Sequence, residues 1–256
     1  GTINAAATAQ RTKDRTGDIL SILIFQGSIS PELCISPAES NTAGYKRDDN
    51  YQYSDPAAAT TAGGQPANAL WDPGFSGSAA TVEPNYRRGD NGQVGGTPKV
   101  GHQSYAHNLP FGKRAAKWTN SFSATEAVFG NRGPFYTDTQ YPTTGRYTLN
   151  PAGATPPGVD SNTLLIHGGR NTWEGNVAYN DNHVNFETKP NPDGLTYRRT
   201  GTAQPLSVPD NIFIDEQNEA GTGAVTDPGS RSNNFLRQIA QVTESSGVIT
   251  ATLFID

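Results

Sequence analysis

The sequence is poor in charge and almost free of sulfur. Charged residues make up 17% of its 256 residues, with one cysteine and no methionine, whereas average soluble domains carry about 25% charged residues. A net charge of −5 without a long basic run excludes nucleic-acid binding as the main role. Because the chain holds 28 glycines and 18 prolines instead, we expect a loop-rich protein with a modest core.

The single cysteine, Cys34, excludes a disulfide bond within the chain. It stands between Leu33 and Ile35, so we expect a small buried apolar side chain rather than a nucleophile. Long hydrophobic runs are lacking too, because no stretch of about 18 apolar residues occurs. We therefore expect no membrane span in this chain and no signal peptide.

The motifs of large enzyme classes are also missing. The sequence contains no Gly-x-Ser-x-Gly nucleophile motif and no phosphate-binding loop. We predict that the protein is not an enzyme. Tyrosine, phenylalanine and tryptophan are nevertheless spread along the chain, which indicates a folded rather than a disordered protein.

The N-terminal residues 1–27 predict a helix that stops at Gly27. Four apolar residues are expected on one face of this helix: Ile19, Leu20, Leu23 and Ile24. Residues 40–101 are rich in turn-forming residues and predict a long irregular region. The sequence therefore divides into a helix over 1–27 and a globular head over 28–256.

The second half of the chain predicts short strands. Two apolar runs, 163–166 and 212–214, each favour a strand. The alternating runs 175–180 and 183–187 predict a β-hairpin, because the intervening Asp181-Asn182 pair tolerates the positive φ of a type I′ turn. In that hairpin we expect Val177 and Tyr179 on one face of the first strand, and Val184 and Phe186 on one face of the second.

Two alternatives fit the C-terminal residues 235–255. Residues 235–242 have the spacing of a helical face, but they also fit one arm of a hairpin that turns at 245–247. Residues 248–255 are β-branched and apolar, which favours a strand. The order of elements predicts an α+β fold, with an N-terminal helix packed on a small antiparallel sheet and long irregular loops.

Four short segments resemble the type IV pilin-like proteins (prepilins and pseudopilins) of the planctomycete type. They are the helix, the Cys-Ile-Ser-Pro segment at 34–37, the Ser-Tyr-Ala-His-Asn segment at 104–108, and a C-terminal motif at 167–184. In that motif Asn182 stands where the family has glycine. The residues of this sequence that match the family pattern are Cys34, Tyr105, His167, Trp173, Asn176, Tyr179, Asp181 and His183.

The resemblance implies a pilin-like fold and a structural role without catalysis. Such a protein would be extracellular or on the cell surface, as a subunit of a pilus, a pseudopilus or another filament. It would associate with copies of itself and with other pilin-like subunits. The resemblance further implies that this association uses an apolar half-helix, which would lie upstream and is not among these 256 residues.

An oxygen-rich loop is a candidate calcium site. Asp48, Asp49, Asn50 and Asp55 could supply the oxygen ligands that Ca²⁺ prefers. The alternative is a solvated turn, since these residue types also form turns. Apart from this possible calcium ion, we expect no cofactor.

The tryptophans support a second function, a secreted module that binds carbohydrate or another surface polymer. Trp71 and Trp118 are candidates for stacking on glycans, among many tyrosines and asparagines. The alternative for each is packing against loops that have no other core. For Trp173, which lies in the motif, we predict packing.

Overall fold

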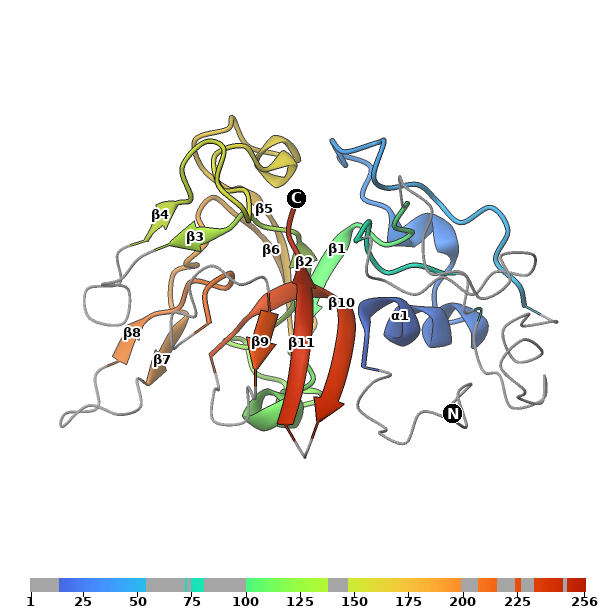
Figure 1. Cartoon of the computed structure of the whole chain (residues 1–256). Coiled ribbons are helices and arrows are strands. Elements are labelled where there is room, and N and C mark those ends of the chain that lie inside the picture. The colour runs from blue at the N-terminus through green and yellow to red at the C-terminus, as the bar shows by residue number, and fades with distance from the viewer. Residues whose placement is uncertain are drawn as a thin grey trace. The chain divides into compact units, whose positions relative to one another are not determined.

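The structure is a computed structural model that describes residues 14–53, 72, 75–80, 100–137, 147–198, 207–215, 224–226, 233–245 and 248–256. The chain divides into two compact units. The first comprises Gly1–Ser104 and Gln238–Phe254, and the second comprises Tyr105–Arg237 and Ile255–Asp256. Figure 1 labels the helix and the strands of both units.

The described residues combine one α-helix, short 3₁₀-helices and antiparallel strands, which makes the fold α+β in class, as predicted. The helices are α1 (Thr16–Phe25), η2 (Pro31–Cys34), η4 (Gly112–Lys117) and η5 (Asn162–Leu165). The strands are β1 (Tyr105–Asn108), β2 (Ala127–Asn131), β3 (Tyr136–Thr137), β4 (Thr148–Leu149), β5 (Gly175–Tyr179), β6 (Val184–Glu187), β7 (Thr196–Arg198), β8 (Ser207–Pro209), β9 (Ala224–Thr226), β10 (Leu236–Ser245) and β11 (Val248–Phe254).

Helix α1 ends as the sequence predicts. Gly27 has a φ of +74°, and its N–H donates to the carbonyl of Ile24, while the N–H of Ser28 donates to the carbonyl of Leu23. This pair of bonds satisfies the last carbonyls of a helix and needs a residue that tolerates left-handed backbone. The helix begins at Thr16, so the prediction is wrong for Asp14 and Arg15, which are not helical. Residues 1–13 of the predicted helix lie outside the described residues.

The buried face of α1 differs from the predicted one. Leu20 and Ile24 are buried as expected, but Leu23 is 38% exposed, so its predicted packing is wrong. The buried face turns instead through Thr16 and Ser21. The backbone N–H of Ile239 in β10 donates to Thr16 Oγ1 at 2.8 Å, so a polar contact seats the helix against this strand. A pattern based on hydrophobicity alone misses such a face.

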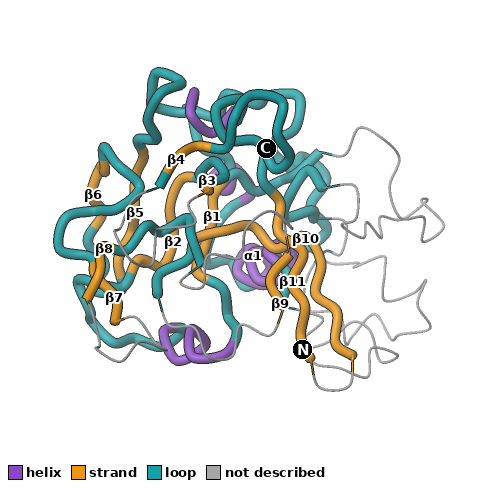
Figure 2. The backbone as a smooth tube through the Cα atoms, turned by 60° about the vertical axis from the view of Figure 1, so that its left-hand side comes forward, coloured by secondary structure: helices purple, strands orange, loops and turns teal. Residues whose placement is uncertain are grey.

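In the second unit β6, β5, β2 and β1 form an antiparallel sheet in that order, and the first residues of β10 pair with β1. Figure 2 shows these strands as neighbouring tubes. In the first unit β10 continues and pairs with β11 as an antiparallel hairpin. Of the two alternatives for 235–255 the hairpin is therefore correct, and the helix is wrong.

Two predicted strands are wrong. Residues 163–166 lie largely in the 3₁₀-helix η5, where the hydroxyl of Ser161 accepts the N–H of Thr163 at 3.2 Å. Residues 212–214 form a turn, because Asn211 Oδ1 accepts the N–H of Phe213 at 2.9 Å. In both cases a polar side chain captures a backbone group that a strand would have paired. The apolar side chains of Leu164, Ile212 and Phe213 are still buried.

The hairpin of β5 and β6 is confirmed, but its turn is not of type I′. Only Asn182 has positive φ, at +70°. The N–H of Asn182 donates to the carbonyl of Tyr179, and the N–H of Tyr179 donates to the carbonyl of His183, both at 3.0 Å. This is a three-residue loop that ends in a left-handed residue, which explains why asparagine is tolerated at 182.

One hydrophobic core fills the second unit on one side of its sheet. Val177, Ala106 and Leu236 contribute from the strands, while Trp173 and Phe213 contribute from the loops. The ring of Trp173 is fully buried and meets the ring of Phe213 edge-on, with centroids 4.8 Å apart. Packing, the role predicted for Trp173, is confirmed.

Candidate functional site

Two of the short segments singled out in the sequence meet in the first unit. The backbone N–H of Ser104 donates to the carbonyl of Cys34 at 2.9 Å, and the N–H of Ser36 donates to Ser104 Oγ at 2.7 Å. Cys34 is buried, as predicted, and burial raises the pKa of its thiol to about 12. A thiol with so high a pKa is not a nucleophile at neutral pH. Tyr105, which follows this junction, begins β1.

The C-terminal motif folds around the turn of the β5–β6 hairpin. His183 stacks on Tyr179 with ring centroids 4.3 Å apart, and its Nδ1 contacts Asp181 Oδ1. This hydrogen bond from His183 lowers the pKa of Asp181. The hydroxyl of Tyr179 donates to Glu187 Oε1 at 2.8 Å. The polar groups of the motif therefore hold one another and close the turn.

The remaining motif residues contact the strands and loops that surround the hairpin. Trp173 Nε1 donates to the carbonyl of Arg132 at 2.7 Å, and the N–H of Asn176 donates to Asn131 Oδ1 at 2.7 Å. The ring of His167 meets the ring of Phe186 edge-on, with centroids 5.4 Å apart. The structure therefore brings His167, Trp173 and the hairpin into one region of the second unit.

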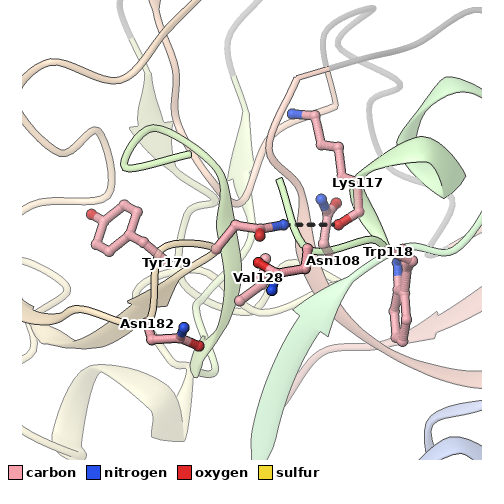
Figure 3. A pocket seen from close by; sticks show the side chains of 8 residues that line it. Asn108, Lys117, Trp118, Val128, Tyr179 and Asn182 are labelled. Carbon is pink, nitrogen blue, oxygen red and sulfur yellow. Dashed lines mark hydrogen bonds between the residues drawn. The ribbon is translucent and has the colours of Figure 1, made fainter. Parts of the chain in front are cut away.

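A hollow of about 290 Å³ lies beside this hairpin, where β1 and β5 end and β2 begins. Figure 3 shows its lining, with Trp118 and Tyr179 at opposite sides. The lining residues are Asn108, Lys117, Trp118, Asn120, Val128, Tyr179, Asn180 and Asn182. Five of these eight are polar or charged without being aromatic, and none is acidic, so the hollow suits a polar ligand without a positive charge.

Asn180 fastens one wall of the hollow. Its Nδ2 donates to the carbonyls of Lys117 (3.2 Å) and Thr119 (2.9 Å), and its Oδ1 accepts the N–H of Ser121 at 2.9 Å. The bond to Lys117 is drawn in Figure 3. These bonds tie the segment after η4 to the hairpin, so the position of Trp118 depends on residues about sixty positions later in the chain.

Trp118 stands at the rim of the hollow and is 43% exposed. Its ring meets the edge of the His107 ring, with centroids 5.5 Å apart. His107 is buried, and its Nδ1 donates to the carbonyl of Asn108 at 2.8 Å. Burial lowers the pKa of His107 to about 4, so the imidazole beside Trp118 is neutral at neutral pH.

Asn108 is a residue that the analysis of the sequence missed. It is 2% exposed, yet neither Nδ2 nor Oδ1 has a hydrogen-bond partner in the part of the chain that the structure describes. The only signal in the sequence is its place at the end of the Ser-Tyr-Ala-His-Asn segment. Its burial depends on η4 and the hairpin, which no local pattern reveals.

A buried polar network was missed as well. Asp210 accepts hydrogen bonds from Asn233 Nδ2 (3.1 Å) and from the N–H (2.8 Å) and Nδ2 (2.9 Å) of Asn234. Burial raises the pKa of Asp210. Arg114 joins through Asn233 and through an ion pair of 3.1 Å with Asp215. These hydrogen bonds and the ion pair connect distant loops in the interior.

Two of the residues proposed for calcium, Asp48 and Asp49, differ in burial and in their partners. Asp48 is buried, accepts the N–H of Asn50 at 2.9 Å, and has its Oδ2 3.6 Å from His102 Nδ1. Asp49 is exposed and pairs with Arg47. Among the described residues no group of three or more His, Cys, Asp or Glu is placed to hold a metal ion. Asp55 and Trp71 lie outside the described residues.

No helix within the described ranges is long and apolar enough to cross a membrane.

Comparisons with known proteins do not identify a relative. No protein-family model matches the chain, and neither a curated protein nor a solved structure matches it significantly. The geometry of the described residues is therefore the basis for a functional proposal.

Proposed function

We propose that the protein is a structural subunit of an extracellular or cell-surface filament, of the pilin-like type that its short segments resemble, and that it performs no catalysis. One observation carries the proposal: the motif that holds the resemblance builds an edge hairpin with an apolar outer face. Val184 is 61% exposed and Phe186 is 51% exposed on β6. Soluble monomers rarely gather large apolar side chains on an exposed strand unless a partner covers them.

The position of β6 supports a contact with a second subunit. In its sheet β6 is the outer strand and pairs with β5 on one side. An outer strand presents backbone donors and acceptors to another chain. On the same face Ala178 lies beside Val184, whereas the polar Asn176 lies beside Phe186, so the apolar surface extends from β6 to Ala178 only.

The roles of the motif side chains fit a structural subunit. Asp181 and His183 bond to each other, and Tyr179 bonds to Glu187, so these polar groups stabilise the turn of the hairpin. We expect this hairpin to make a lateral contact with another copy of the chain. The main association is expected to involve an apolar helix upstream, as the resemblance implies.

Cysteine crosslinking tests the proposal in the gene-encoded protein in its own cells. The only cysteine of these 256 residues, Cys34, is buried and can be replaced by alanine as a background. Val184→Cys in that background should give covalent dimers with a bifunctional maleimide in the fraction sheared from the cell surface, because each subunit then carries one reactive thiol. A matched control is Leu33→Cys, which is 66% exposed but lies in the first unit.

Dimers with Val184→Cys and none with Leu33→Cys would support a filament contact through β6. Absence of the protein from the sheared fraction would refute the filament role. Equal crosslinking by both variants would show that β6 makes no specific contact.

A further inference from the structure

The Asn108 amide is a buried polar group with nothing to bond in the described part of the chain. Native proteins pair the great majority of their buried polar groups, and an exception calls for an explanation. Asn108 is one of the residues that line the hollow beside the hairpin. The explanation that this geometry favours is a ligand that supplies the missing partners.

We propose that the hollow binds one neutral sugar ring, with Asn108 as the hydrogen-bonding group and Trp118 as the stacking surface. This proposal does not depend on filament formation. A primary amide offers N–H donors and a carbonyl acceptor in one plane. Neighbouring hydroxyls, or an acetamido group on a sugar, match both atoms at once. A carboxylate would repel the amide oxygen, and a cation would repel the amide hydrogens.

The charges around the hollow also favour a neutral ligand. None of the eight lining residues is acidic, and Lys117 is the one cation among them. The ammonium of Lys117 donates to Asn234 Oδ1 at 3.3 Å, so it is directed to another group of the protein. The volume of about 290 Å³ lies at the small end of the range for ligand sites, which suits a single ring.

Trp118 is held in a position where its ring can take a ligand. The backbone N–H of Trp118 donates to the carbonyl of Ala115 at 3.2 Å, which fixes its backbone at the end of η4. The ring is held by its edge-to-face contact with the ring of His107. The ring remains 43% exposed. The C–H face of a pyranose is apolar and packs on the electron-rich face of an indole ring.

The walls of the hollow are formed before a ligand arrives. Asn180 uses its whole amide to bond Lys117, Thr119 and Ser121. Rigid walls reduce the ordering that binding would otherwise require. We therefore expect measurable affinity for a single ring despite the small area of contact.

Titration of the purified chain with sugars tests the proposal. Glucose, mannose and N-acetylglucosamine are added separately while nuclear magnetic resonance follows the Asn108 side-chain amide and the Trp118 indole N–H. Glycerol and sodium acetate serve as negative probes. At least one sugar should shift both resonances in a saturable manner. Preference for N-acetylglucosamine over glucose would assign the acetamido group to Asn108, and the reverse would assign the hydroxyls.

Variants separate binding from folding. Asn108→Leu removes the unpaired amide, so the fold should be at least as stable, while affinity for the sugar should fall roughly tenfold or more. Trp118→Ala should weaken binding to a similar degree. The matched control is Phe122→Ala, which removes an aromatic ring that is 68% exposed and does not line the hollow.

Two results would overturn the proposal. One is the absence of shifts with every sugar at tens of millimolar. The other is unchanged affinity in a folded Asn108→Leu variant.

Discussion

The two faces of the sheet formed by β1, β2, β5 and β6 are covered very differently. On one face Ala106, Val177 and Leu236 are fully buried beneath the rings of Trp173 and Phe213. The register places Phe129 and Ala178 side by side on the other face, with Val184 beside them. This second face is partly covered at β1 and bare at β6.

The two faces differ because the side chains of each strand alternate between them. Successive side chains point to opposite faces, so the same five residues of β5 supply a core and a surface. Loops of the chain itself cover the first face. At the β1 end of the second face, the ring of Trp118 meets His107, whereas Val184 and Phe186 at the β6 end remain exposed. We infer that the buried face stabilises the fold of the chain itself, and that a partner covers the exposed face of the outer strand β6.

The largest expected effect follows from opening the covered face. Trp173→Ala removes a fully buried ring and the hydrogen bond from its Nε1 to the carbonyl of Arg132. The free energy of unfolding should fall by about 3–5 kcal/mol. Urea denaturation followed by circular dichroism measures the change. A loss of less than about 1 kcal/mol would contradict the packing of this face.

An intermediate effect on the free energy of unfolding is expected from His107, at the covered end of the second face, and this effect depends on pH. Burial lowers the pKa of His107 from its usual 6.5 to about 4, so between these values the unfolded chain binds a proton that the folded chain does not. Stability from this group is complete above pH 6.5 and is lost as the pH falls toward 4. The loss between pH 7 and 4.5 should be on the order of 2 kcal/mol.

His107→Gln isolates this effect, because it removes the titrating imidazole and leaves the carboxylates and the other histidines unchanged. The difference in unfolding free energy between the parent and this variant should narrow as the pH falls. A difference that does not change between pH 7 and 4.5 would show that the imidazole is not protected from protonation. His183→Asn, at the half-buried turn of the hairpin, serves as the comparison.

The smallest effect on stability is expected at the bare end. Phe186→Ala shortens a side chain that is 51% exposed and contacts the ring of His167, so the free energy of unfolding should change by less than about 1 kcal/mol. The same change should reduce crosslinking through Val184→Cys. Thermal unfolding and crosslinking measured on the same variant would sharpen the contrast between the faces. A large loss of stability would place Phe186 in the core instead.

Elements whose structure is set by neighbouring residues were predictable from the sequence. The hairpin at 175–187 was predictable because alternation and two turn-forming residues act within thirteen positions. The end of α1 was predictable because Gly27 alone supplies the left-handed backbone. Packing of Trp173 was predicted from its place in the C-terminal motif, and its ring is fully buried. Even in the hairpin, however, the choice of turn depended on bonds between Tyr179 and His183.

Segments governed by distant partners were not predictable in the same way. Residues 212–214 have the composition of a strand, but Asn211 and Asp210 direct them into a turn, and Asp210 does so through residues 23 and 24 positions later. The hydrophobic face of α1 was misjudged for a similar reason, since Thr16 is buried by a bond to Ile239. Polar groups with remote partners have no periodic signal.

The sequence by itself determined that the chain has an α+β fold with a hairpin at 175–187, because periodicity and turn residues act over short distances. Only the tertiary structure decided that Trp118 and Asn108 share a hollow and that Val184 and Phe186 remain bare. Asn108 and Asn180 are 72 positions apart, and both line the hollow. Such a juxtaposition arises from strand pairing and from long-range hydrogen bonds, whose partners cannot be identified from residue types alone.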